Sequence, residues 1–200
     1  MKTTFYIVRH GRTVFNKKGL VQGWCDSPLI QEGIDQAKTL GKSLKDINFA
    51  YGISSSSERA SDTMDYILQN RCPSTTSKGL KETGFGLMEG DSIDTSFPNG
   101  FIDPKGYPEK GGEPMDKALV RFIDTLEKVA KDYQGKNILV VSHGNILCGF
   151  FRTLDQEFQK STLYPGKLVP NCSVTIVTYD NGEFTLESWP DTSYLQQQEL

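Results

Sequence analysis

Two short apolar runs constrain the fold of this chain more than any other feature of its sequence. Residues 3–9 (TTFYIVR) and 137–142 (NILVVS) are rich in β-branched side chains, and each has the length and character of a strand buried on both faces. Helical patterns lie between the predicted strands, so strands alternate with helices along the chain. This alternation predicts an α/β fold, with a largely parallel sheet between two layers of helices in a three-layer α/β/α arrangement.

The other elements follow from periodicity and turn residues. Apolar positions recur at helical spacing in four segments, at about 33–47, 58–69, 114–130 and 144–154. A brief strand is expected at 51–54. Near the end of the chain, Asn181–Gly182 is a typical hairpin turn, which predicts paired strands at about 173–179 and 184–189.

Residues 83–112 differ from the rest of the chain. They are rich in glycine, contain three prolines and show little periodicity, which is typical of an irregular insertion or lid. No repeat and no linker divides the remainder. We therefore expect one domain over residues 1–200, with a lid insertion at about 83–112.

Composition excludes several classes of protein. A net charge of −3, from 22 basic and 25 acidic side chains, does not favour nucleic-acid binding. No apolar run approaches the ~20 residues of a membrane span, and the arginine-containing N-terminus is unlike a secretory signal. The four cysteines form no C-x-x-C pair, which fits reduced thiols. We expect a cytoplasmic protein without nucleic-acid or membrane partners.

The chain has two histidines, His10 and His143, and each is followed by glycine at the end of a predicted buried strand. The carboxyl ends of parallel strands line the ligand crevice of an α/β sheet, so this repeated setting predicts a shared site. Arg9 adds a permanent cation whose fork suits phosphate oxygens. Arg59, at the start of a helix after a third strand, could add a second fork; a surface position is the alternative. The helix after His143 points its free N–H groups the same way.

These residues belong to a longer pattern. Val8-Arg9-His10-Gly11-Arg12-Thr13, with Asn16, resembles the signature of the histidine phosphatase (phosphoglycerate mutase-like) superfamily. The resemblance continues in order through nearly the whole chain, in Gly23-Trp24-x-Asp26-x-Pro28-Leu29, Ser54-Ser55-x-x-x-Arg59-Ala60, Leu80-x-Glu82-x-x-Phe85-Gly86-x-x-Glu89-Gly90, Gly111-Gly112-Glu113, Val141-Ser142-His143-Gly144 and Pro170-Asn171-Cys172-Ser173.

The resemblance implies roles for individual residues. His10 would attack phosphorus and carry the phosphoryl group, while Arg9, Arg59 and His143 hold its oxygens and stabilise the transition state. Glu82 would protonate the leaving oxygen and later activate water, with Glu89 as the rival candidate. Additional donors would be Asn16, Gln22 and the Gly144 N–H. Such a reaction needs no metal ion and no cofactor.

Three positions depart from the family pattern. Arg12 stands where relatives usually have an acidic residue, and it is either a ligand for a second anionic group or a surface charge. Phe15 keeps the aromatic character of its position but stands where relatives often have tryptophan. Ile30 replaces a threonine that usually caps the next helix, and loss of such a cap costs ~1 kcal/mol.

Three functions remain compatible with the sequence. They are a phosphatase acting on a small phosphorylated metabolite, a mutase, and a non-catalytic module that binds phosphorylated partners. The complete set of site residues disfavours the last. Glycolytic mutases of this superfamily carry a longer, basic, arginine-containing insertion, whereas residues 83–112 contain two lysines and five acidic residues. Their aromatics, Phe85, Phe97, Phe101 and Tyr107, would suit an organic leaving group or a small core under the lid. The sequence favours the phosphatase.

Overall fold

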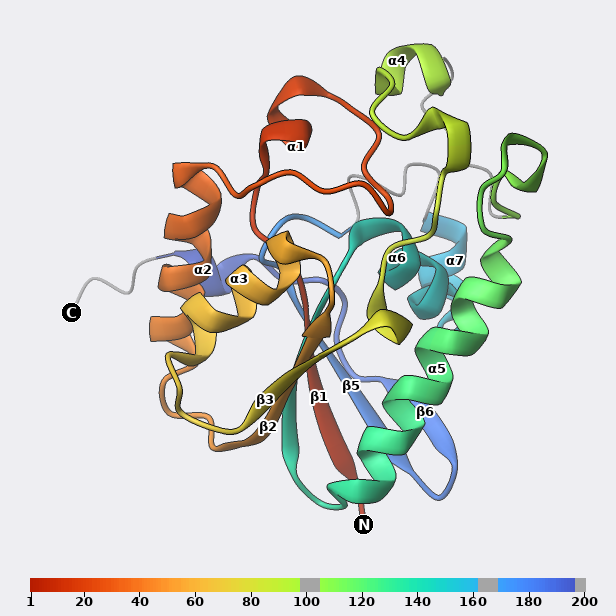
Figure 1. Ribbon diagram of the computed structural model, residues 1–200. Helices are drawn as coiled ribbons and strands as arrows, with labels where there is room; N and C mark the ends of the chain where they lie inside the picture. Colours follow the sequence, from red (N-terminus) through yellow and green to blue (C-terminus); the bar gives the residue numbers. More distant parts are fainter. Residues whose placement is uncertain (98–104, 162–168, 197–200) are drawn as a thin grey trace.

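The computed structural model describes residues 1–97, 105–161 and 169–196, and its centre is a six-stranded sheet (Figure 1). The strand order is β3-β2-β4-β1-β5-β6. The strands are β1 (Thr3–Arg9), β2 (Phe49–Ser55), β3 (Ser74–Ser77), β4 (Asn137–Ser142), β5 (Val174–Asp180) and β6 (Glu183–Leu186). The first four in this order run parallel, and β5 and β6 are antiparallel additions. The predicted α/β fold with a largely parallel sheet is confirmed.

Helices cover both faces of the sheet. In Figure 1, α2 (Gln31–Ser43) and α3 (Glu58–Leu68) lie on one side, and α5 (Met115–Asp132) and α6 (Gly144–Leu154) on the other. The shorter helices are α1 (Val14–Lys18), α4 (Ile93–Ser96), α7 (Gln156–Ser161) and the 3-10 turns η1 (Lys78–Leu80), η2 (Gly86–Met88), η3 (Pro108–Lys110) and η4 (Ser193–Leu195). No helix in these described ranges is long and apolar enough to cross a membrane.

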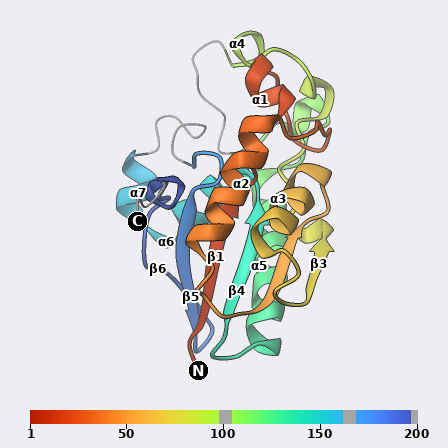
Figure 2. The same cartoon turned by 90° about the vertical axis from the view of Figure 1, so that its left-hand side faces the viewer.

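The central strands supply side chains to two separate cores. In β4, Ile138 and Val140 pack with α5 and α6, while Leu139 and Val141 pack with α2 and α3. Successive side chains of a strand point to opposite faces, so a run that is apolar at every position fills both layers. Figure 2 shows these strands rising from the N-terminus towards the end of the molecule where α1 and α4 lie.

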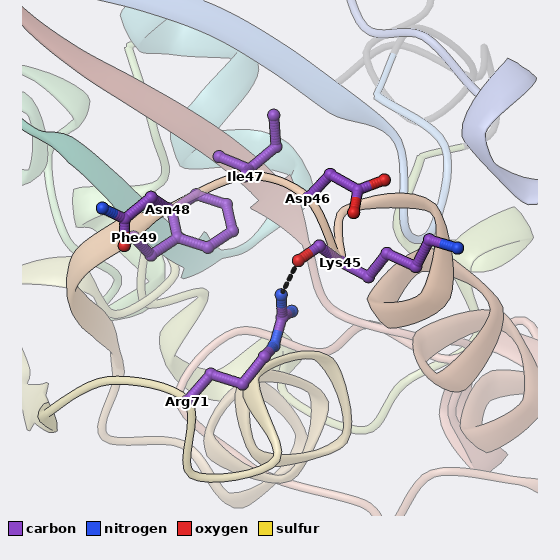
Figure 3. A pocket seen from close by; sticks show the side chains of 6 residues that line it. All are labelled: Lys45, Asp46, Ile47, Asn48, Phe49 and Arg71. Atoms are coloured by element: carbon purple, nitrogen blue, oxygen red, sulfur yellow. Dashed lines mark hydrogen bonds between the residues drawn. The ribbon is translucent and has the colours of Figure 1, made fainter.

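Helix α2 differs from its predicted range of 33–47. It begins at Gln31, and Ile30 at its N-cap makes no side-chain hydrogen bond, as the missing threonine predicted. It ends at Ser43, and Arg71 donates to the carbonyls of Leu44 and Lys45 just beyond the helix end. Arg71 also donates to two carbonyls at the end of α3 and so joins the two helices. The hollow of about 330 Å³ beside it (Figure 3) lies near the start of β2, at the other end of this strand from the histidines.

The described part of residues 83–112, which we predicted to be an insertion, contains short turns around a small core. Phe85, Met88 and Phe97 are buried there with Val21, and Tyr107 packs against them. The Phe97 ring lies 6.0 Å from Phe85 and 5.5 Å from Tyr107, centre to centre. Phe85, Phe97 and Tyr107 therefore form a small core, and Phe101 lies outside the described residues.

Candidate active site

The sheet brings the two histidines together. His10 follows β1 and His143 follows β4, and these neighbouring parallel strands are in register, with Arg9 beside Ser142. The His10 N–H donates to the Ser142 carbonyl at 3.0 Å, which extends the ladder past the strand ends. The two imidazole rings lie 5.2 Å apart, centre to centre, at an angle of 59°. Both are buried.

Hydrogen bonds define the protonation of His10. Its Nδ1 lies 2.8 Å from the Gly11 carbonyl oxygen, which can only accept, so in the neutral ring Nδ1 carries the proton. Burial, with the positive charges of Arg59 and Arg9, lowers the pKa of His10 well below its ordinary value. The ring is therefore neutral at pH 7, and its lone pair is on Nε2.

Arg59 reaches this lone pair from the start of α3. The side chain is fully buried, and its Nε donates towards His10 Nε2 at 3.4 Å. Its terminal nitrogens donate to the carbonyls of Gly23 (2.9 Å) and Cys25 (3.0 Å) and to the Asp26 carboxylate (2.8 Å). Residues 23–26 thus fix the guanidinium in one orientation. The sequence contains the Gly23-Trp24-x-Asp26 motif, but the motif alone does not indicate that it binds the Arg59 side chain.

Arg9 and His143 carry buried polar atoms that have no hydrogen-bond partner among the described residues. These atoms are Arg9 Nε and both ring nitrogens of His143. Burial and nearby cations, Arg59 first, lower the pKa of His143 well below its ordinary value. Unpaired buried polar groups are rare and costly, and phosphate oxygens would accept from Arg9 Nε–H and from the one ring nitrogen of neutral His143 that carries a proton. A Cβ on Gly144 would lie 3.2 Å from Arg9 Cζ, so a side chain at this position would press on the guanidinium.

Glu82 lies at the N-terminus of α6, beside the histidine pair. Its carboxylate accepts from the N–H groups of Thr83 (2.9 Å), Asn145 (2.8 Å) and Ile146 (2.7 Å). Gly144 opens the same helix, and its N–H makes no hydrogen bond within the described ranges. Burial raises the pKa of Glu82 in spite of the backbone N–H groups that favour its charge. A carboxyl whose pKa is raised is suited to giving up and regaining a proton.

Glu89, the rival candidate, lies in a different setting. Its carboxylate accepts from four backbone N–H groups, those of Gly23, Trp24, Cys25 and Phe85. Burial would raise the pKa of Glu89, but the hydrogen bonds outweigh it and hold the pKa below its ordinary value. Glu82 is therefore the better candidate for the proton donor, because its pKa is raised and it bonds to the helix that follows His143.

Asn16 and Gln22 belong to a hydrogen-bond network in the loops next to His10. Asn16 caps α1 together with Thr13, and its Oδ1 accepts from Asn171 Nδ2 at 3.3 Å. Asn171 Nδ2 also donates to the His10 carbonyl at 2.8 Å. Gln22 accepts from the Thr13 hydroxyl at 2.8 Å. Both predicted donors thus lie near His10 with side chains already engaged in this network.

Arg12 forms an ion pair with Glu32 on the surface. Its Nη1 donates to the two carboxylate oxygens of Glu32 at 2.9 and 2.8 Å, and the two side chains are 40% and 50% exposed. Of the two predicted possibilities for Arg12, this geometry favours the surface charge.

Sequence reasoning missed Arg121 of α5. Its guanidinium donates to the carbonyls of Gly79, Lys81 and Glu82, at 2.8, 2.8 and 2.9 Å. The same group forms a two-pronged ion pair with Glu113, at 2.8 and 2.7 Å. Arg121 thereby fixes the backbone that carries Glu82. The only sequence signal was Glu113 in the Gly111-Gly112-Glu113 motif, whose side chain is 13% exposed and pairs with Arg121.

Comparisons with known proteins agree with this architecture. Residues 5–192 match the model of the histidine phosphatase superfamily (branch 1), and this chain belongs to that superfamily. It is 31% identical to a metal-independent phosphoserine phosphatase of Arabidopsis thaliana, over 96% of this chain and 83% of the relative. No group of three or more His, Cys, Asp and Glu side chains in the described ranges is arranged to bind a metal ion.

Two solved structures are similar over nearly the whole chain. A phosphoglycerate mutase from Bacillus anthracis is 32% identical, with a TM-score of 0.83 and coverage of 97% of this chain and 95% of that one. A phosphoserine phosphatase from Entamoeba histolytica, crystallised with 3-phosphoglyceric acid, is 25% identical, with a TM-score of 0.77 and coverage of 97% and 100%. A variant of the latter was crystallised with phosphoserine.

Proposed function

We propose that this chain is a phosphoric monoester hydrolase of the histidine acid phosphatase type, which releases phosphate from small metabolites without a metal ion. One observation carries the proposal. His10 is a neutral, buried imidazole whose Nδ1 donates to the Gly11 carbonyl and whose Nε2 lone pair faces Arg59. An imidazole held in this tautomer beside permanent cations is a nucleophile suited to a phosphoryl group.

The first half-reaction forms a phosphohistidine. His10 Nε2 attacks phosphorus as the bond between phosphorus and the ester oxygen breaks. Arg9, Arg59 and His143 bind the other phosphoryl oxygens, whose charge grows in the transition state. Glu82 gives its proton to the departing alkoxide, so an alcohol leaves and a carboxylate remains.

The second half-reaction returns the enzyme to its starting state. The Glu82 carboxylate takes a proton from water, whose oxygen attacks phosphorus as the bond to His10 Nε2 breaks. Phosphate leaves, Glu82 is again protonated, and His10 is again neutral. Its raised pKa makes Glu82 fit for both steps.

The relatives support a class of substrate. The names of two of them include phosphoserine phosphatase, and another relative, from Saccharomyces cerevisiae, is a broad-specificity phosphatase. Small phosphorylated metabolites are the substrates we propose for this chain. Its four cysteines are free thiols, which supports the proposal that it works in the cytoplasm.

A panel of phosphorylated metabolites, assayed for phosphate release with and without a chelator, tests the proposal. We expect release from at least one phosphomonoester at an unchanged rate in the chelator. Release abolished by the chelator and restored by a divalent metal would contradict it. The mutase is the second candidate, because of the likeness to the Bacillus anthracis mutase.

A further inference from the structure

Glu89 organises the loop that faces the active site. Its carboxylate accepts from three successive N–H groups, those of Gly23 (2.9 Å), Trp24 (2.7 Å) and Cys25 (3.2 Å). A fourth bond, from Phe85 N–H at 3.0 Å, ties the same carboxylate to the insertion. Two carboxylate oxygens offer about four acceptor positions, so these bonds use the capacity of the group.

The opposite side of this loop binds Arg59. The carbonyls of Gly23 and Cys25 accept from the two terminal nitrogens of Arg59, at 2.9 and 3.0 Å. Residues 23–25 therefore present their N–H groups to an anion and two of their carbonyls to a cation. The Gly23 carbonyl and the Trp24 N–H belong to one peptide plane, so turning this plane would break the bond to Arg59 and the bond to Glu89 together.

There is little room for the loop to adjust. A Cβ on Gly23 would lie 2.5 Å from Glu89 Oε1 and 2.6 Å from the Phe85 ring, so the backbone packs directly on the carboxylate and the insertion. Trp24 adds a further link, since its indole N–H donates to the Glu82 carbonyl at 3.0 Å. A shift of this loop would be transmitted to both Arg59 and Glu82.

We propose that Glu89 is a positioning residue that acts through residues 23–25 to hold the Arg59 guanidinium against His10 Nε2. The inference rests on the proposed function in that Arg59 is taken to bind the phosphoryl group. Glu89 itself touches no reacting atom and transfers no proton. An uncharged glutamine would replace one acceptor oxygen by an NH2 group, leaving two of the four N–H groups without a partner.

A double-mutant cycle on phosphate binding tests this path. Calorimetry with inorganic phosphate measures affinity without turnover, in Glu89→Gln and Arg59→Ala separately and together. We expect Glu89→Gln to weaken phosphate binding about tenfold in the wild-type background, because small misplacements of an anion clamp are costly. In the Arg59→Ala background the same change should have less than about a twofold effect. Glu89→Asp keeps the charge and should recover part of the phosphate affinity. If Glu89→Gln does not fold, Glu89→Asp takes its place in the cycle.

Phe97→Leu is the matched control. It loosens the core of the insertion but leaves the Glu89 carboxylate and the 23–25 loop in place, so we expect phosphate affinity close to wild type at a comparable loss of thermal stability. Equal effects of Glu89→Gln in both Arg59 backgrounds, or the same loss of affinity in Phe97→Leu, would overturn the proposal.

Nuclear magnetic resonance gives a reading that needs no ligand. The Arg59 Nε–H should exchange slowly with water in the wild type and in Phe97→Leu, and rapidly in Glu89→Gln; unchanged exchange in Glu89→Gln would also overturn the proposal. Wild-type protein that binds phosphate but hydrolyses no ester would refute the proposed hydrolysis and leave the cycle to decide on Glu89.

Discussion

Arg59 contacts His10 through one nitrogen of each side chain: Arg59 Nε donates towards the His10 Nε2 lone pair at 3.4 Å. The distance is long for a hydrogen bond of this kind, so the contact is weak. An anionic phosphoryl oxygen is a stronger acceptor than a neutral imidazole. A bound substrate would therefore take over the Arg59 Nε–H and release the lone pair that attacks phosphorus. The contact between Arg59 and His10 therefore occupies the Nε2 lone pair until a phosphoryl group binds.

Replacement of His10 should remove the covalent intermediate. Wild-type protein quenched after brief exposure to labelled substrate should carry an acid-labile, base-stable phosphoryl group, as expected of a phosphohistidine. In His10→Ala the adduct should be absent, and kcat/KM should fall at least about a thousandfold. Circular dichroism checks that the variant is folded. A labelled adduct that survives in His10→Ala would contradict the assignment.

Replacement of Glu82 should separate substrates by their leaving groups. An alkoxide needs a proton to depart, whereas an aryl phenolate leaves unaided, so Glu82→Gln should slow alkyl phosphates by about a hundredfold or more and aryl phosphates much less. The comparison is a ratio of kcat/KM values for two substrates of one variant, which cancels differences in active protein. Glu89→Gln should slow both classes by similar factors. If Glu82→Gln lowers kcat/KM equally for alkyl and aryl phosphates, the role of Glu82 is structural.

The histidine pair should make stability depend on pH. The pKa values of His10 and His143 are well below 6.5 in the folded protein, while in the unfolded chain they return to about 6.5. Below pH 6.5 the unfolded state thus binds more protons, and the free energy of unfolding falls as pH falls. Each histidine contributes a slope of up to about 1.4 kcal/mol per pH unit, and this stability is fully present only above pH 6.5.

Urea unfolding at pH 7.5, 6.5 and 5.5 measures this slope. His143→Gln should reduce it by about half, because the chain has two histidines and one would remain. The raised pKa of Glu82 acts in the opposite direction, since the folded state then retains a proton as pH rises from 4.5. Wild type and His143→Gln both contain Glu82, so the difference between their slopes largely cancels the contribution of Glu82. Parallel curves for wild type and His143→Gln would contradict the lowered pKa of His143.

The sequence predicted the elements whose apolar side chains follow a regular pattern. Residues 137–142 were predicted as a buried strand and form β4 with the same bounds, because apolar side chains at every position require two covered faces. The meeting of His10 and His143 was also predictable, since parallel strands that end in a similar way place those ends at one edge of the sheet.

Other elements had no such signal. Helix α1 is five residues long and depends on a capping box between Thr13 and Asn16, which no apolar period marks. Strand β3 is a polar edge strand of four residues, so neither alternation nor burial distinguishes it from a loop. Arg121 makes its bonds to backbone carbonyls about forty positions away, and nothing local in a helical arginine identifies such partners.

Loss of Arg121 should affect stability and catalysis together. Arg121→Ala leaves three carbonyls and the half-buried Glu113 carboxylate without their donor, which should cost about 2–3 kcal/mol in urea unfolding. Alkyl phosphates should again be slowed more than aryl phosphates, because the displaced backbone carries Glu82. The exposed Lys117→Ala on the same helix serves as the control and should change neither quantity. A stability loss with an unchanged ratio between the two substrate classes would show that Arg121 does not position Glu82.

Phosphate release should exceed isomer formation in a direct comparison of phosphatase and mutase activity. A mutase must bind a second anionic group and keep water from the phosphoenzyme, yet 83–112 contains two lysines and no arginine, and Arg12 is paired with Glu32. Incubation with 3-phosphoglycerate and a catalytic amount of the 2,3-bisphosphate primer, with 2-phosphoglycerate and phosphate followed together, measures both reactions. Glu32→Gln would free Arg12 for a second anion, so KM for 3-phosphoglycerate should fall while hydrolysis still dominates. Isomer formation that outpaces phosphate release in the wild type would place the mutase first.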